Sequence, residues 1–313
     1  MVEYHYDSWG NVIDISGDGR YFVYFDKIMR GLKMKYQYYF YELYNEKIEN
    51  YLNEKKIHFQ KHECDVTGDS LVFSIWSNNP NYKTIINELE NLNVRDPLVF
   101  VKYSVAELNN AKLLVMTPKK QTIDIINSEE AYKYSCEWLS SVGVKKIKHM
   151  EQVGTLAIGK EPSTKNSTAF WTEDTGFAEL FTDQRVYELV RACSLEGIKF
   201  ENVMNRNGTY SKNIFQVKSS NIITRECIGV GYGEKKEICH VCGKEQFFID
   251  NVYQLHLNLS KMAIQSDLYM TERMWGEGIA YPLYIISQRF YQLLKKNKLA
   301  GGITISPVVE INE

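Results

Sequence analysis

The chain has 313 residues, of which 44% are hydrophobic and 24% are charged, and its formal net charge is −2. This balance excludes the strongly basic surface of a general nucleic-acid or anionic-lipid binder. No apolar run approaches the roughly 18 residues that span a bilayer, and the N-terminus lacks a signal-peptide pattern. Six cysteines are too few for a disulfide scaffold in a chain of this length. We therefore expect a cytoplasmic protein with no membrane or nucleic-acid partner.

The first 33 residues differ in pattern from the rest of the chain. Residues 4–13 alternate aromatic and polar side chains and then turn at Gly10-Asn11, which predicts a β-hairpin. This stretch resembles one YD repeat of the Rhs and WapA-like polymorphic toxins. The resemblance implies that residues 1–33 are a remnant of an upstream toxin gene, and the alternative is a coincidental match. A single copy cannot bury its own face, since such arrays need about three repeats.

Residues 34–160 predict an N-terminal module of mixed α/β character. Strands are expected at 34–44, 57–66, 70–76, 97–103 and 112–118, and helices at 45–56, 81–93 and 106–109. Ser128 is a suitable N-cap, so a further helix is expected over 129–141.

Residues 161–313 contain an internal duplication. Once Gly302 is treated as an insertion, residues 184–203 match 288–308 at Gln184, Arg185, Tyr187, Leu189, Leu195, Gly197, Ile198 and Val203. Each copy is expected to run from a strand through an N-cap (Asp183 or Ser287), a helix and a glycine C-cap (Gly197 or Gly301) into a second strand. The sequence therefore predicts an α+β protein whose C-terminal module is built on a strand–helix–strand duplication.

A ribbon-like insertion is predicted between the two copies, at residues 224–248. Its CHVCG segment, residues 239–243, has the two close cysteines and the following glycine of a zinc knuckle. Cys227 stands upstream, where a complete ribbon would place its second cysteine pair. His256 is a candidate fourth ligand, whereas His240 inside the knuckle is poorly placed.

These residues predict a zinc ion held by Cys227, Cys239 and Cys242. Its role is expected to be structural, because the metal site of a ribbon has no open position for a substrate. The alternative is a degenerate ribbon with three reduced cysteines and no metal.

One dense stretch of aromatic and acidic residues lies at 168–177. Trp171, Glu173 and Asp174 could form an exposed lip that binds a basic protein partner. In the alternative interpretation, the flanking phenylalanines belong to the core and the acids cap turns.

No group of residues reaches the strength of a catalytic motif, so we do not expect an enzyme. We interpret His149 and Glu151 as ordinary solvent-exposed polar residues, and His58 and His62 as surface residues. The glycine-rich segment 229–236 lacks the GK[ST] of a phosphate loop and is interpreted as a hairpin.

The end of the chain, Ile286-Ser287-Gln288-Arg289 through Gly301 to Ile305-Ser306-Pro307-Val308, resembles the closing segment of a family of bacterial immunity proteins. These are the double-CxxCG proteins of polymorphic toxin systems and their imm11-type relatives. The resemblance covers about 165–313, with CHVCG matching one CxxCG motif and Cys227 standing at a degenerate second one. It implies a cytoplasmic immunity protein that neutralises a cognate Rhs- or WapA-like toxin by direct binding.

Two other functions remain open. A hydrolase or nuclease-like toxin module behind a YD remnant would be toxic in a cell that lacks its inhibitor. A zinc-ribbon nucleic-acid-binding protein would bind DNA or RNA in a salt-sensitive way.

Overall fold

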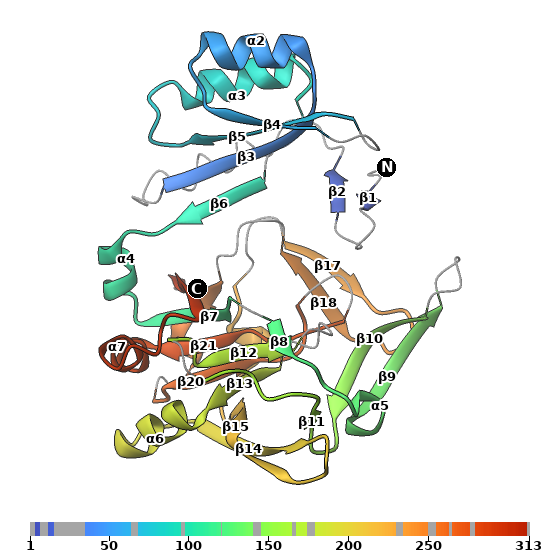
Figure 1. Ribbon diagram of the computed structural model, residues 1–313, viewed down its shortest axis with the longest axis vertical. Coiled ribbons are helices and arrows are strands. Elements are labelled where there is room, and N and C mark those ends of the chain that lie inside the picture. Colours follow the sequence, from blue (N-terminus) through green and yellow to red (C-terminus); the bar gives the residue numbers. More distant parts are fainter. Residues whose placement is uncertain are drawn as a thin grey trace. The chain divides into compact units, whose positions relative to one another are not determined.

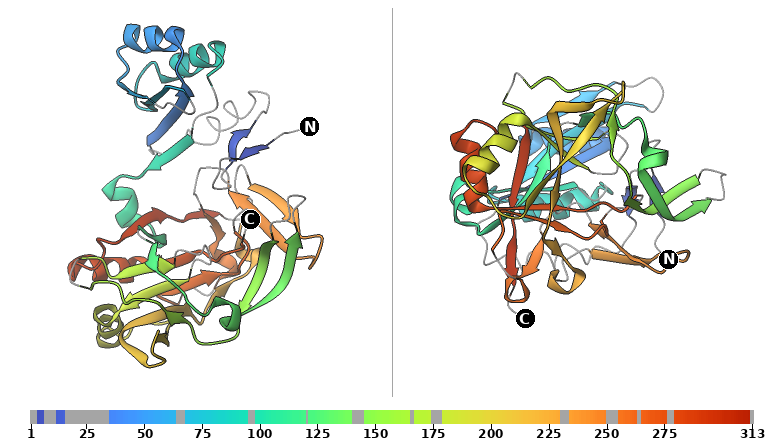
Figure 2. Two further views of the ribbon diagram at one scale, coloured as in Figure 1. Left: turned by 45° about the vertical axis from the view of Figure 1, so that its right-hand side comes forward. Right: turned by 90° about the horizontal axis from the view of Figure 1, so that it is seen from below.

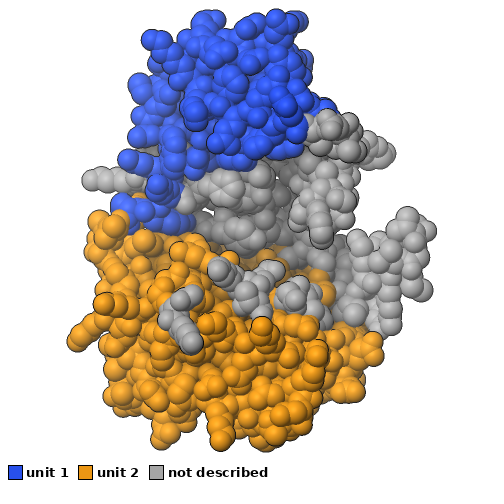
Figure 3. Space-filling model, in the orientation of Figure 1, with its two compact units in different colours: residues 1–104 blue, residues 105–313 orange. Residues whose placement is uncertain are grey.

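The computed structural model (Figure 1) consists of two compact units, Met1–Ser104 and Val105–Glu313, which Figure 3 shows in separate colours. It describes residues 4–6, 12–15, 35–63, 68–94, 98–119, 121–139, 145–164, 167–173, 179–229, 234–249, 255–262, 265–275 and 279–311. Its helices and strands confirm the predicted α+β class. The division at residue 104 differs from the expected one at 160, because residues 105–160 supply strands to the sheets of the C-terminal unit.

Among its described residues, the N-terminal unit contains a four-stranded antiparallel sheet and two helices. Its elements are β3 (Lys35–Leu43), α2 (Glu46–Glu54), β4 (Phe59–His62), β5 (Ser70–Trp76), α3 (Tyr82–Asn91) and β6 (Leu98–Lys102). The strand order is β4-β5-β3-β6. This order of elements and strands is that of the split β-α-β, or ferredoxin-like, motif.

Side-chain periodicity explains these elements. Tyr38 and Phe40 alternate along β3 and enter the same core as Leu52 of α2. Helix α2 begins where the Asn45 side chain accepts the backbone N–H of Lys47. In the N-terminal segment, β1 (Tyr4–Tyr6) and β2 (Val12–Ile15) pair antiparallel, which confirms the predicted hairpin.

Among its described residues, the C-terminal unit contains a six-stranded sheet, a five-stranded sheet, two small hairpins and one pair of parallel strands. After α4 (Val105–Asn110), its first series of elements is β7 (Leu113–Pro118), β8 (Gln121–Ile123), α5 (Ser128–Ala131), β9 (Tyr132–Leu139), β10 (Lys145–Gln152), β11 (Ala157–Ile158), β12 (Phe170–Glu173), β13 (Leu180–Asp183), α6 (Gln184–Ala192) and β14 (Ile198–Asn205). Its second series is β15 (Tyr210–Ser219), β16 (Ile222–Ile223), the 3-10 helix η1 (Arg225–Cys227), β17 (Glu234–Ile238), β18 (Glu245–Ile249), β19 (His256–Asn258), the 3-10 helix η2 (Leu259–Lys261), β20 (Leu268–Thr271), β21 (Tyr284–Ser287), α7 (Gln288–Lys296), β22 (Ile303–Pro307) and β23 (Val309–Ile311).

The two series have the same order. Strands β7, β8, β11, β12 and β13 correspond to β15, β16, β19, β20 and β21, helix α6 corresponds to α7, and β14 corresponds to β22 with β23. We call 113–205 the first repeat and 210–311 the second repeat. The duplication therefore extends well beyond 184–203 and 288–308. Segment 224–248 is not an insertion between two copies, because its hairpin β17–β18 occupies the place in the second repeat that β9–β10 occupies in the first.

Each repeat places its first strand in the sheet of the other. The six-stranded sheet has the order β11-β14-β15-β13-β12-β8, so β15 of the second repeat lies among strands of the first. The five-stranded sheet has the order β16-β20-β21-β7-β22, so β7 of the first repeat lies among strands of the second. The two repeats are thus interlocked through exchanged strands.

The strand register is the same in both sheets. Val217 of β15 lies opposite Leu180 on one side and Phe200 on the other. Met116 of β7 lies opposite the aligned residues of the second repeat, Tyr284 and Ile305. This agreement supports a duplication of the whole repeat.

Both repeats contribute to one hydrophobic cluster that contains their helices. Helices α6 and α7 lie side by side (Figure 2) and bury Val190 and Leu294 in the same cluster. The predicted N-caps are confirmed: the side chain of Asp183 accepts from the first turn of α6, and that of Ser287 accepts from the first turn of α7. Each helix therefore begins where its strand ends.

Two local predictions are wrong. The glycine C-caps at Gly197 and Gly301 are not used, because the left-handed residue after each helix is Ser194 or Lys298. The helix expected over 129–141 ends at residue 131, as α5, and gives way to β9. Residues 132–136 alternate aromatic or cysteine side chains with polar ones, a period of two that suits a strand.

Among the described residues, no helix is long and apolar enough to cross a membrane.

Candidate metal centre

Hairpin β9–β10 brings Cys136 and His149 together. The two residues lie directly opposite each other on antiparallel strands, so their side chains are neighbours on one face. The strand register is irregular on both sides of His149. Such bulges re-aim a side chain relative to its strand, and here the imidazole Nδ1 lies 3.3 Å from the sulfur of Cys136.

Hairpin β17–β18 supplies Cys239 and Cys242 from its turn. The N–H of Cys239 donates to the carbonyl of Lys244 at 2.9 Å, and the N–H of Gly243 donates to the carbonyl of Cys239 at 2.8 Å. Gly243 has a φ of 71°, a conformation that favours glycine. The CHVCG segment therefore forms the tight turn that its sequence predicts.

The four side chains form a compact cluster, with one ligand atom of each within 4.8 Å of the other three. His149 Nδ1 lies 3.2 Å from Cys242 Sγ, and the sulfurs of Cys136 and Cys239 are 3.6 Å apart. A tetrahedral zinc ion with ordinary bond lengths places its ligands about 3.8 Å apart for two sulfurs and about 3.6 Å apart for sulfur and nitrogen. The cluster could thus hold a metal ion after small movements.

The cluster is enclosed by protein. Cys136, His149 and Cys239 are 4%, 2% and 2% exposed, and Cys242 is half-buried. The pKa of Cys136 is raised to about 11, mainly by burial and secondarily by hydrogen bonds with the thiols of Cys239 and Cys242. For Cys239, burial acts in the same direction, but hydrogen bonds from the backbone of Cys242 and Val241 outweigh it and lower the pKa. The surroundings of Cys239 therefore favour ionisation of its thiol more than those of Cys136 do, and a bound cation would favour ionisation of both.

The structure brings together only two of the three predicted ligands. Cys227 is not part of the cluster: it is buried in a separate core, where its thiol donates to the carbonyl of Lys261 at 3.6 Å. His256 lies in β19, opposite Val309 of β23. Neither Cys227 nor His256 belongs to the four-residue cluster, and His240 is exposed.

Sequence analysis missed the other half of the site. His149 is buried among thiols, so its interpretation as a solvent-exposed polar residue is wrong. Cys136 went unnoticed because no second cysteine or histidine lies close to it in sequence. The available signal was the alternating pattern of residues 132–136, which predicts that Cys136 points to the same side as the buried Tyr132.

The expected partner-binding lip is not on the surface. Trp171 is 3% exposed and belongs to a core cluster with Phe181. Glu173 is 1% exposed, and its Oε2 accepts the N–H of Glu179 at 2.6 Å. Asp174 lies outside the described residues. The prediction of an exposed lip is therefore wrong for Trp171 and Glu173.

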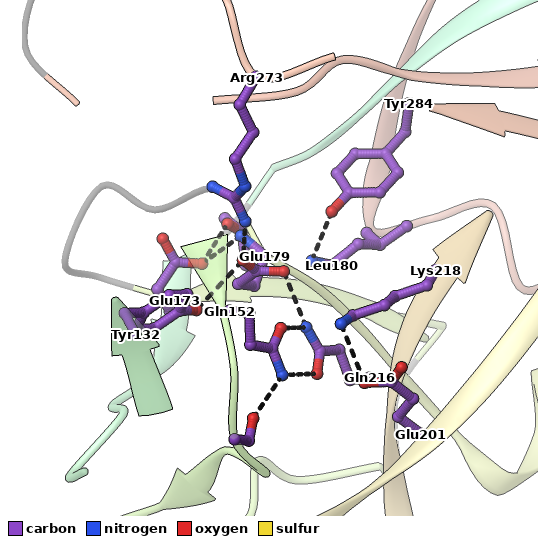
Figure 4. Close-up of polar contacts among 12 residues, drawn as sticks. Tyr132, Gln152, Glu173, Glu179, Leu180, Glu201, Gln216, Lys218, Arg273 and Tyr284 are labelled. Carbon is purple, nitrogen blue, oxygen red and sulfur yellow. Dashed lines mark hydrogen bonds and ion pairs between the residues drawn. The ribbon is translucent and has the colours of Figure 1, made fainter. Parts of the chain in front are cut away.

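A buried polar network centres on Glu179 (Figure 4), whose exposed fraction is 2%. Its Oε1 accepts from the hydroxyl of Tyr132 at 3.1 Å and from the guanidinium of Arg273. Its Oε2 accepts from the side-chain amide of Gln216 at 2.8 Å. Gln216 and Gln152 exchange two amide hydrogen bonds of 2.7 and 3.0 Å. The charge of the carboxylate is therefore balanced by Arg273, and both of its oxygens accept hydrogen bonds.

This network anchors the base of hairpin β9–β10. Tyr132 and Gln152 are paired at the end of the hairpin that joins the rest of the repeat. Burial, and then the charge of Glu179, raises the pKa of Tyr132, so its hydroxyl remains a donor. The hairpin is thus fixed at its base by the network, while Cys136 and His149 lie further along it.

No protein-family model matches the chain, and no curated protein matches it.

Proposed function

We propose that Cys136, His149, Cys239 and Cys242 bind one Zn²⁺ ion with a structural role. The observation that carries this proposal is the gathering of three sulfurs and one imidazole nitrogen at near-tetrahedral spacing. Thiolate and imidazole ligands favour zinc over magnesium or calcium, which prefer oxygen ligands. Four protein ligands leave no position for substrate, so the ion would stabilise the fold.

Metal analysis of the purified full-length protein tests this proposal. We expect about one equivalent of zinc per chain, retained through gel filtration and released when a thiol-specific mercurial reagent titrates the cysteines. A zinc-free protein that also fails to bind added zinc would contradict the proposal.

We also propose that the protein is an immunity protein that neutralises a polymorphic toxin domain by direct binding. Two features support this proposal. The C-terminal segment and the CHVCG motif resemble the double-CxxCG immunity proteins, and the CHVCG cysteines belong to a cluster with metal-ligand geometry. The β1–β2 hairpin coincides with the stretch that resembles a YD repeat of the toxins themselves.

Affinity capture combined with a growth assay tests the immunity proposal. The full-length protein should capture the C-terminal domain of an Rhs- or WapA-like protein from its own strain, and its co-expression should restore growth to cells that produce this domain. Failure of rescue in a strain shown to make the toxin would count against immunity. Toxicity of the protein itself in a naive cell would favour the enzyme alternative.

A further inference from the structure

The two repeats of the C-terminal unit meet at one exposed turn. The first repeat ends with β14 at Asn205 and the second begins with β15 at Tyr210. The intervening residues 206–209 are all exposed, and Gly208 has no atom within 4 Å of an added Cβ. A single break in this turn would separate the repeats covalently without removing any strand.

Neither repeat contains a complete sheet by itself. Without β15, the facing edges of β13 and β14 would lose every hydrogen bond that they make to it, and β21 and β22 would lose theirs without β7. Unpaired strand edges and buried backbone groups without partners are strongly unfavourable. The strand that fits each gap is the first strand of the other repeat.

The loops that follow the two helices also contact the opposite repeat. The N–H of Asp267, just before β20, donates to the carbonyl of Glu196 at 2.9 Å, and Glu196 N–H donates back to the Asp267 side chain at 2.9 Å. In the corresponding contact, Thr168, just before β12, forms a β-bridge with Ala300. A Cβ on Gly197 would lie 1.7 Å from Ser266 Oγ, which explains why this position requires glycine.

The candidate metal centre is divided equally between the repeats. Cys136 and His149 come from the first repeat, and Cys239 and Cys242 come from the second, from hairpins in corresponding positions. Both hairpins form two-stranded sheets separate from the larger sheets. Isolated two-stranded hairpins are marginally stable in water, so an ion shared between them would connect the repeats and order both hairpins.

We propose that the two repeats form a self-sufficient binding pair: after the turn at 206–209 is cut, each repeat remains bound to the other through the exchanged strands β7 and β15, and the shared metal ion slows their separation. The partner that fits the binding surface of one repeat is the other repeat. The strand-exchange part of this inference stands on the sheet topology alone. The metal part rests on the proposed zinc site.

The test uses the full chain with one protease recognition sequence between Ser104 and Val105, a second between Asn207 and Gly208, and an affinity tag after Glu313. Cleavage at both sites breaks every covalent link between the first repeat and the tagged second repeat. We expect the first repeat to stay on the affinity resin in native buffer and to leave it in denaturant. Cutting at the first position also prevents the N-terminal unit from contributing to retention.

Three outcomes distinguish the parts of the inference. Prompt loss of the first repeat in zinc-containing native buffer would overturn the pairing. Retention, with release accelerated about tenfold or more by a chelator or by Cys136→Ser, would support both parts. If the first repeat is retained and neither a chelator nor Cys136→Ser changes its rate of release, strand exchange is upheld and the metal's role is overturned. Cys227→Ser, which alters a buried thiol outside the cluster, is the matched control.

Discussion

The hairpins β9–β10 and β17–β18 occupy corresponding places in the two repeats, but their sequences reveal the candidate metal centre to different degrees. In β17–β18, Cys239 and Cys242 lie in one tight turn, so their spacing indicates a metal site directly. In β9–β10, Cys136 and His149 lie on different strands and meet only because those strands pair in one register. Two hairpins that contribute equally to a site can therefore differ completely in sequence signal.

The difference has a physical cause. A turn fixes the distance between residues close in sequence through its own backbone hydrogen bonds. A cross-strand contact depends on register, and a shift of one residue moves a side chain to the other face. The irregularity beside His149 makes its orientation harder still to predict.

Removal of a ligand from either hairpin should abolish zinc binding to the same extent. Cys136→Ser and Cys239→Ser each leave an incomplete ligand set, so we expect bound zinc to fall from about one equivalent to near zero. Zinc content after dialysis, measured by atomic emission, checks this prediction. Cys227→Ser should keep its zinc, because Cys227 lies outside the cluster.

Loss of zinc from Cys239→Ser but not from Cys136→Ser would break the equivalence of the two hairpins. A substitution that preserves coordination sharpens the comparison: His149→Cys should retain the metal as a four-cysteine site, whereas His149→Ala should not. Equal zinc content in both variants would exclude His149 as a ligand.

Removal of the metal should loosen both hairpins and leave the larger sheets folded. Each hairpin forms a two-stranded sheet of its own, with one further β-bridge from Phe247 of β18 to Trp275, whereas β7 and β15 are interior strands of the larger sheets. We expect amide hydrogen exchange with a chelator to rise by about tenfold or more in 132–139, 145–152 and 234–249, and to change little in 113–118 and 210–219. A uniform rise across the C-terminal unit would instead indicate that the metal stabilises the whole unit.

The base of the first hairpin should respond to loss of Arg273. Arg273→Met leaves the buried carboxylate of Glu179 without its cation, and removal of one partner from a buried ion pair costs about 3–5 kcal/mol. The control is Arg289→Met, since the Arg289 side chain that pairs with Asp267 is 55% exposed and its loss should cost about 1 kcal/mol or less. Urea unfolding of the full chain measures both values, and equal losses would contradict the role of burial.

The smallest effect is expected in the N-terminal unit, which contains neither hairpin of the candidate metal centre. The carboxyl of Glu88 accepts hydrogen bonds from the Tyr51 hydroxyl and from Lys55. Both bonds lower the pKa of this carboxyl below its ordinary value of 4.5, and the bond from Tyr51 has the larger effect. The resulting stabilisation is present above pH 4.5 and is lost as the pH falls through the lowered pKa. Tyr51→Phe should therefore reduce stability slightly at pH 7, and the difference should shrink as the pH falls below 4.5 and through the lowered pKa of Glu88. Urea midpoints at pH 7 and pH 3 check this, and zinc removal should not change the result.

The sequence by itself determined the features that depend on neighbouring residues. Helix α2 and strand β3 follow from apolar periodicity, Asp183 and Ser287 cap helices as their side chains predict, and the CHVCG segment makes its own turn. The matching residues of 184–203 and 288–308 also revealed a duplication without any knowledge of its architecture.

Tertiary structure decided which distant segments meet. Strand β7 is recognisable as an apolar run, but its place between β21 and β22 is set by the complementary edges of two strands much later in the chain, as the pairing of Met116 with Tyr284 and Ile305 shows. Pairing across β9–β10, together with the approach of β17–β18, selected Cys136 and His149 over Cys227 and His256 as companions of the CHVCG cysteines. Local spacing limits only local geometry, whereas a four-ligand site formed by two hairpins requires the interlocked repeats to bring both hairpins to one place.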